Sequence, residues 1–223
     1  TGISIFLTGK AGTGKTTFLR TIKQRSTKRM IVVAPTGVAA INANGVTIHS
    51  FFQLPLSPFV PESTVKPRFE YSKQKRQIMR TLDLLIIDEI SMVRADILDA
   101  IDSILRRFRE HNKPFGGVQL LMIGDLQQLT PIVRPDEEKL LSRYYNTPYF
   151  FDSKALQSTQ YVTIELTKVF RQQDKVFIDI LNHFRDGNVS DEDFDILNKR
   201  YQPNFTPDEN SDYIHLTTHN RIA

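Results

Sequence analysis

The chain has 223 residues, of which 40% are hydrophobic, enough for the buried core of one large domain or of one domain and a half. No apolar run approaches the ~18 residues of a membrane span, and no targeting peptide is recognisable. The absence of cysteine excludes disulfides and thiolate metal sites within this chain, and the net charge of +4 excludes a uniformly basic or acidic protein. We therefore expect an intracellular protein without a membrane partner.

Apolar segments alternate with helical patterns, which predicts an α/β fold with a parallel sheet flanked by helices. Expected strands cover residues 3–8, 30–34, 84–88, 118–123, 161–166 and 213–217. Helices are expected at 15–23, at 95–109, at 175–185 and after Ser190, where Ser190 and Asp193 form a capping pair.

Residues 9–16 read Gly-Lys-Ala-Gly-Thr-Gly-Lys-Thr, a complete G-x-x-x-x-G-K-[ST] phosphate-binding loop between an expected strand and an expected helix. Backbone N–H groups, the helix N-terminus and the Lys15 ammonium all favour a bound triphosphate. The Thr16 hydroxyl is placed to ligate Mg²⁺. The sequence thus predicts that ATP is bound by Gly12, Thr13, Gly14, Lys15, Thr16 and Thr17.

A second signal for a nucleotide site is the acidic pair Asp88 and Glu89, which comes directly after the apolar segment 84–87, an expected buried strand. In open parallel sheets ligands bind at the carboxyl ends of the strands. Asp88 is therefore predicted to serve Mg²⁺, and Glu89 to activate the attacking water. The alternative is that the two acids cap a helix.

Two further residues carry weaker signals when they are read by themselves. Gln128 follows the expected strand 118–123 and is able to donate to a γ-phosphate oxygen. Arg171 has the chemistry of an arginine that stabilises phosphoryl transfer. Taken alone, it is better explained as one partner of a surface ion pair.

The segment 53–72 contains four prolines and breaks the alternation, so we expect an inserted surface loop or small subdomain. Residues 64–80 carry six basic side chains against one acid, whereas residues 174–212 carry ten acids against four bases. Such blocks fit either a polyanion partner or a solvated charged face.

In its order of motifs the chain resembles the first RecA-like domain of superfamily 1 DNA helicases, specifically the Pif-type helicases related to RecD. The matching stretches are GKAGTGKT at 9–16, APTGVAAINANGVTIHSFF at 34–52, LLIIDEISMV at 84–93, the segment 97–132, and LTKVFRQQDKVF at 166–177. The segment 97–123, which contains Lys-Pro-Phe-Gly-Gly, is similar to the signature that separates Pif-type helicases from other members of superfamily 1.

The resemblance implies an ATP- and Mg²⁺-driven helicase that moves 5′ to 3′ on single-stranded DNA. It implies a monomer that acts at junctions of single and double strands, with roles in DNA repair, recombination and telomere maintenance. The implied compartment is the bacterial cytoplasm (nucleoid), or a nucleus or mitochondrion. Glu89, Gln128 and Arg171 are the implied catalytic residues. The implied single-strand path is lined by Pro35, Thr36, Gly37, His49, Ser50 and Phe51. By themselves, His49 and Phe51 are better explained as structural residues.

The resemblance also implies a domain organisation. Residues 1–52 and 81–185 would form the first RecA-like domain, and 53–80 a wedge-like insert beside the duplex junction. Residues 186–223 would begin a second RecA-like domain. Because later helicase motifs are missing, we expect a fragment of a longer protein. Two alternatives stay open, which are a P-loop kinase and a nucleic-acid-binding module that is not an enzyme.

Overall fold

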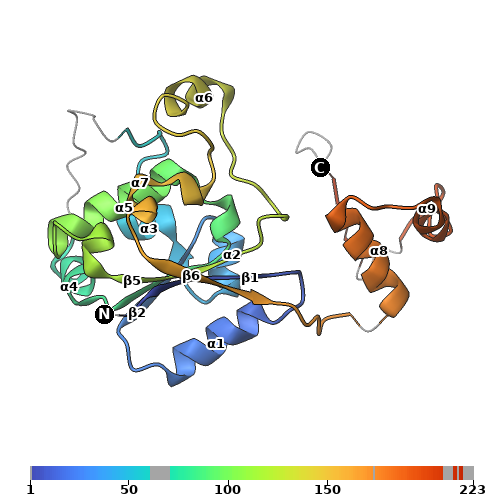
Figure 1. Cartoon of the computed structure of the whole chain (residues 1–223), viewed down its shortest axis with the longest axis horizontal. Coiled ribbons are helices and arrows are strands. Elements are labelled where there is room, and N and C mark those ends of the chain that lie inside the picture. The colour runs from blue at the N-terminus through green and yellow to red at the C-terminus, as the bar shows by residue number, and fades with distance from the viewer. Residues whose placement is uncertain (1, 61–70, 173, 208–212, 215, 218–223) are drawn as a thin grey trace. The chain divides into compact units, whose positions relative to one another are not determined.

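The computed structural model describes residues 2–60, 71–172, 174–207, 213–214 and 216–217 (Figure 1). The chain divides into two compact units, Thr1–Gln173 and Asp174–Ala223, and each is described here by itself. In the described residues no helix is long and apolar enough to cross a membrane.

The first unit is built on a six-stranded sheet in the order β3-β2-β4-β5-β1-β6, with every neighbouring pair parallel. Five expected strands are confirmed, whereas the two-residue β3 was not predicted. The described residues of 213–217 lie in no strand. The strands are β1 (Ser4–Gly9), β2 (Met30–Ala34), β3 (Val46–Thr47), β4 (Leu84–Ile87), β5 (Gln119–Ile123) and β6 (Tyr161–Leu166).

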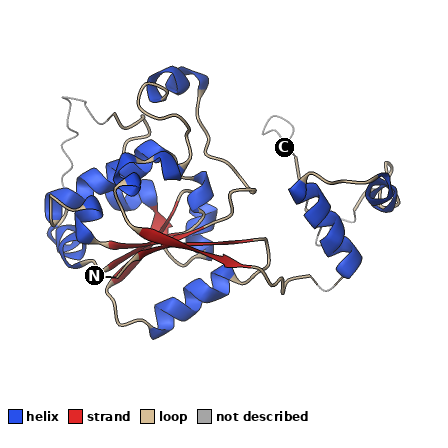
Figure 2. Cartoon of the chain, in the orientation of Figure 1, coloured by secondary structure: helices blue, strands red, loops and turns tan. Residues whose placement is uncertain are grey.

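Helices cover both faces of this sheet (Figures 1 and 2), as expected for a RecA-like fold. The helices are α1 (Lys15–Arg25), α2 (Gly37–Asn42), α3 (Ile48–Phe52), α4 (Lys73–Thr81), α5 (Ala95–Phe108), α6 (Pro135–Leu141) and α7 (Lys154–Gln157). Short 3₁₀ turns are η1 (Ile90–Met92), η2 (Pro114–Gly117) and η3 (Phe150–Asp152).

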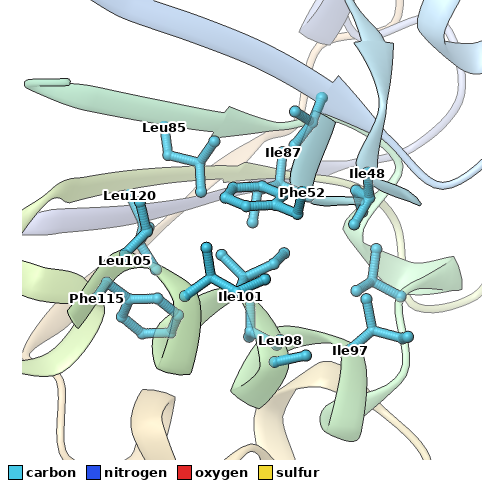
Figure 3. Close-up of a cluster of buried hydrophobic side chains, with 14 of the residues drawn as sticks. Ile48, Phe52, Leu85, Ile87, Ile97, Leu98, Ile101, Leu105, Phe115 and Leu120 are labelled. Atoms are coloured by element: carbon cyan, nitrogen blue, oxygen red, sulfur yellow. The ribbon is translucent and has the colours of Figure 1, made fainter. Parts of the chain in front are cut away.

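The larger core lies between the sheet and α5, and the alternation of side chains along β4 explains it. Leu85 and Ile87 belong to this cluster, whereas Leu84 and Ile86 belong to the cluster beneath α1. Figure 3 shows the larger cluster, in which α5 presents Ile97, Leu98, Ile101 and Leu105 to the strands. The helical periodicity read from the sequence is thus the buried face of α5.

The two described ends of the expected insert return to this core. Leu54, Tyr71 and Met79 are buried in the larger cluster. The Tyr71 hydroxyl donates to the Phe52 carbonyl at 2.7 Å, and Ser72 caps α4. The middle of the insert, residues 61–70, lies outside the described residues. α4 is therefore anchored on the RecA-like core.

The second unit contains α8 (Lys175–Asp186) and α9 (Asp191–Asn198), as the sequence predicts. The Ser190–Asp193 capping box is confirmed, with Asp193 N–H donating to Ser190 Oγ at 3.2 Å. The rings of Phe184 and Phe194 meet edge to face at 5.8 Å. The expected helix at 175–185 therefore belongs to this unit.

Candidate active site at the carboxyl edge of the sheet

The phosphate loop connects β1 to α1 and leaves the start of α1 open to an anion. Gly14 occupies the N-cap position with φ +94°, no side chain caps the helix, and its first turn carries no acid. The first N–H groups of a helix need partners from outside the helix, and its dipole favours negative charge there. The geometry of the loop therefore suits a phosphate group.

Lys15 lies over this loop. Its ammonium donates to the carbonyl of Gly9 at 2.5 Å and to that of Lys10 at 3.1 Å. The Thr13 hydroxyl donates to the same Lys10 carbonyl at 2.8 Å, which closes the loop. The positive charge predicted to grip a phosphate is thus held against the loop backbone.

The acidic pair lies next to the phosphate loop. The Asp88 N–H donates to the Val33 carbonyl at 2.9 Å, which fixes the end of β4 beside β2. Burial, followed by the charge of Glu89, raises the pKa of Asp88 to about 6, and the Lys15 ammonium acts in the opposite direction. Asp88 and the phosphate loop follow the carboxyl ends of β4 and β1, which are parallel and separated by β5 alone, so they share one edge of the sheet.

The backbone of Glu89 is in the left-handed region, with φ +51° and ψ +45°, which residues other than glycine rarely adopt. It stands at the N-cap of η1, yet its side chain makes no capping hydrogen bond. This geometry does not support the alternative that the acid merely caps a helix. Strained residues of this kind concentrate at functional sites, because surrounding structure must hold them in place.

The loop after β5 adds the predicted glutamine. Gln128 Nε2 donates to Asp125 Oδ2 at 3.0 Å, and Asp125 is almost fully buried. The Gly124 N–H donates to the Leu7 carbonyl of β1, and a methyl group on Gly124 would lie 2.9 Å from the Ile90 side chain. This loop is therefore packed against the segment that follows Asp88 and Glu89, with Gln128 exposed beside it.

Arg171 reaches the phosphate loop because β6 pairs with β1. The Phe170 N–H donates to the Gly12 carbonyl at 2.9 Å. A methyl group on Gly12 would lie only 2.6 Å from Arg171 Cβ. With the described residues Arg171 makes no ion pair, so the surface-pair alternative finds no support.

The six residues expected on the single-strand path surround the ends of β2 and β3. Pro35, Thr36 and Gly37 lead into α2, where the Thr36 hydroxyl accepts from the Ala39 N–H at 3.2 Å. His49 and Ser50 lie on α3, half-buried and exposed respectively. Burial and the Arg94 charge lower the pKa of His49, against a smaller opposite effect of Asp96.

Phe51, expected on the same path, is instead a core residue. It is 5% exposed, and its ring meets that of Phe52 edge to face at 4.8 Å. The Lys75 ammonium lies 5.6 Å from the centre of the Phe51 ring. A ring enclosed in this way offers no face to a nucleic-acid base.

A family profile for PIF1-like helicases matches residues 1–195. The chain belongs to this family. The ATP-dependent DNA helicase PIF1 of Candida albicans is 40% identical over 197 residues, which cover 86% of this chain and 22% of that protein. The human ATP-dependent DNA helicase PIF1 is likewise 40% identical, over 198 residues that cover 28% of its length.

Solved structures of Pif1 helicases share the fold. The complex of Bacteroides Pif1 with ADP-AlF3 and single-stranded DNA gives a TM-score of 0.92 at 44% identity, covering 99% of this chain and 51% of that one. A structure of two coordinating Pif1 helicases at forked duplex DNA gives 0.83 at 47% identity, covering 87% and 47%. The chain therefore spans about half of these Pif1 chains and about a quarter of its curated relatives.

Two buried acids of α5 were missed by the sequence analysis of this PIF1-like domain. Asp96 pairs with Arg94 at 2.8 Å, and Arg94 also pairs with Glu137 at 2.8 Å. Asp96 Oδ2 in addition accepts the Phe59 N–H at 2.9 Å, which ties the start of the insert to the segment after the acidic pair.

Asp99 lies one turn further along α5 and is also buried. Its carboxylate accepts from the Tyr145 hydroxyl at 2.8 Å, from the Ser153 hydroxyl, and from the N–H groups of Lys154 and Ala155. In the helical pattern of α5 both acids lie on the side opposite the apolar residues, so the sequence gives no signal that they are buried.

Proposed function

We propose that the intact protein is an ATP-dependent helicase that moves 5′ to 3′ on single-stranded DNA and separates duplex DNA. The observation that carries this proposal is the convergence of the phosphate loop, Asp88, Glu89 and Arg171 at one sheet edge in a member of the PIF1-like family. Support for the DNA substrate comes from Pif1 relatives that were solved with single-stranded and with forked DNA.

The donor set at the strand end fits Mg²⁺ held jointly with a nucleotide. In the described residues no group of three or more His, Cys, Asp or Glu side chains could hold a metal unaided. Mg²⁺ bound with phosphates commonly takes only one or two protein donors, a role for which Asp88 and Thr16 are suited. When bound, the ion neutralises charge on the phosphate oxygens. It would also offset the cost of burying the Asp88 carboxylate.

The chain's own residues then divide the work of hydrolysis. Gly12, Thr13, Gly14, Lys15, Thr16 and Thr17 hold the phosphates. Glu89 takes the proton of the attacking water, while Gln128 and Arg171 contact the γ-phosphate. The held position of Arg171 against Gly12 supports its role, because an arginine near the transferred group can contribute ~10³–10⁵ in rate.

DNA would be gripped by residues at the ends of β2 and β3, namely Pro35, Thr36, Gly37, His49 and Ser50. The domain organisation expected from the sequence is part of this proposal, with a wedge-like insert at 53–80 and a second RecA-like domain beginning near 186. The proposal does not include the expected monomer, because a related structure is described as two coordinating Pif1 helicases.

The test is ATP hydrolysis by the full-length protein with and without single-stranded DNA. We expect DNA to stimulate turnover, and Lys15→Ala to abolish both turnover and unwinding. Lys139→Ala, which removes an exposed lysine from α6, should change neither. Hydrolysis that ignores DNA would favour the P-loop kinase alternative. Retained hydrolysis in Lys15→Ala would refute the assignment of the phosphate loop.

A further inference from the structure

An exposed basic surface lies on α4, the helix that follows the gap in the described residues of the insert. The helix carries four basic side chains and no acid. Lys73, Arg76 and Arg80 recur at i, i+3 and i+7, so they share one side of the helix, and all three are exposed. Met79 points into the core instead, and Lys75 donates to the Ser50 carbonyl.

The C-terminal end of α5 extends this surface, and Figure 1 shows α4 beside α5. The Arg109 guanidinium donates to the Arg80 carbonyl at 2.7 Å, and the rings of Tyr71 and Phe108 meet at 5.4 Å. Burial raises the pKa of Tyr71 to about 12, and the nearby Arg107 guanidinium acts in the opposite direction. Arg107 is exposed and adds a fourth cation. We call Lys73, Arg76, Arg80 and Arg107 the α4 basic face.

The charge of the α4 basic face is not neutralised within the described part of the chain. Among the described residues, three acids near the C-terminal ends of α4 and α5 pair with other cations: Asp102 with Arg106, Glu110 with Lys113, and Asp83 with Arg29. None of the four cations of the face has an acidic partner among the described residues. An exposed basic stripe of this kind attracts a polyanion.

The place of the face in the fold separates it from the nucleotide site. α4 ends at Thr81, immediately before β4 begins, and α5 ends before β5. The C-terminal ends of both helices therefore lie at the amino edge of the sheet, whereas the phosphate loop follows the carboxyl end of β1. Arg80 and Arg107, which lie near these ends, are thus on the opposite edge of the sheet from ATP, so the face needs another anionic partner.

We propose that the α4 basic face binds the phosphate backbone of the double-stranded arm of a DNA junction. At ~1.5 Å rise per residue, Lys73 and Arg80 are separated by roughly 10 Å along the helix. Laid along the duplex axis, that length covers about three phosphates of one strand, which recur every ~3.4 Å of axis. The side chains are thus spaced for a row of phosphates.

Duplex is favoured over single-stranded DNA because the face lacks a stacking platform. Proteins that hold single strands combine a basic groove with exposed aromatic rings. Here Tyr71 is buried and Phe108 is partly buried, and the exposed apolar side chain of α4 is Ile78. Contacts limited to phosphates give sequence-independent duplex binding.

This inference rests on the proposed function, and its test separates the two. Binding of the full-length protein is measured at ~50 to ~200 mM salt on a fork and on a single strand that matches the fork's single-stranded tail. The test variant is Lys73→Gln/Arg76→Gln/Arg80→Gln. The control variant, Arg20→Gln/Arg25→Gln/Lys139→Gln, removes the same charge from exposed positions of α1 and α6.

The slope of log K against log salt is negative, and each lost phosphate contact reduces its magnitude by ~0.9. On the fork, the slope of the test variant should therefore be smaller in magnitude than that of wild type by roughly 2 to 3. Its single-strand affinity and its single-strand-stimulated hydrolysis should match wild type, and the control should keep the wild-type slope. An unchanged fork slope, as expected if the face binds an acidic protein, overturns the inference. An equal loss on single strands overturns it too. Failure of the proposed function would show separately, as hydrolysis by wild type that ignores single-stranded DNA.

Discussion

Replacing Gly12 with alanine tests whether the phosphate loop positions Arg171. At Gly12 φ is +79°, where an L-residue costs about 1–2 kcal/mol. The new methyl group would also lie 2.6 Å from Arg171 Cβ, against ~3.5 Å for an ordinary carbon contact. Arg171 Cβ adjoins the backbone and cannot rotate away, so the 170–171 segment must move by roughly 0.9 Å. A misplacement of about 1 Å costs on the order of 10²-fold in turnover.

The assay is DNA-stimulated hydrolysis by the full-length protein at saturating ATP, with nucleotide affinity measured separately. Gly187→Ala is the matched control, because Gly187 has φ +72° and nothing within 4 Å of an added methyl group. Both variants should lose the stability that a positive φ costs a residue with a side chain, but only Gly12→Ala should lose ~10²-fold in turnover. Since the loss is attributed to Arg171, adding Gly12→Ala to Arg171→Ala should cost little more. Wild-type turnover in Gly12→Ala, or fully multiplicative losses in the double variant, would refute the reasoning.

Two further predictions concern buried carboxylates. The pKa of Asp88 is raised to about 6 in the fold, so its burial costs stability as pH rises from ~4 through 6. Asp88→Asn should therefore exceed wild type in unfolding free energy by more at pH 7.5 than at pH 5, which lies inside this window, in nucleotide-free denaturation, and an equal difference at both pH values would contradict this. Asp99→Ala leaves three buried donors without their acceptor at ~1–3 kcal/mol each, besides the partly buried Lys154 N–H, and should cost at least about 3 kcal/mol in the same assay, whereas exposed Ser103→Ala on the same helix should cost almost nothing. A loss for Asp99→Ala no larger than that of Ser103→Ala would rule out its role as a structural acceptor.

The parts of the fold that follow from local patterns could be predicted from sequence. β4 is a run of four buried apolar residues, and α5 carries a clear helical period. The phosphate loop is encoded in eight consecutive residues, and its glycines take the positive φ values that the motif needs. Each of these features depends mainly on neighbouring residues, so a sequence motif is sufficient to locate it.

The features that were missed depend on which strands and helices meet. Arg171 was named through the family resemblance, but its contact with Gly12 arises because β6 pairs with β1, and the residues near Arg171 do not indicate that pairing. Phe51 and Phe52 are adjacent aromatics on a one-turn helix, so sequence could not show that both rings are enclosed. Asp99 reads as one more charged residue until the segments that carry Tyr145 and Ser153 are folded against it.

The proposed movement along single-stranded DNA requires that the nucleotide held by Lys15 set how tightly the protein binds the strand. The most direct measurement is the affinity of the full-length protein for a single-stranded oligonucleotide, with ADP and with a non-hydrolysable ATP analogue. We predict a difference of about 5- to 150-fold between the two nucleotides, the usual range of coupling between sites, and no difference in Lys15→Ala. Equal affinities in wild type with both nucleotides bound would contradict the claim.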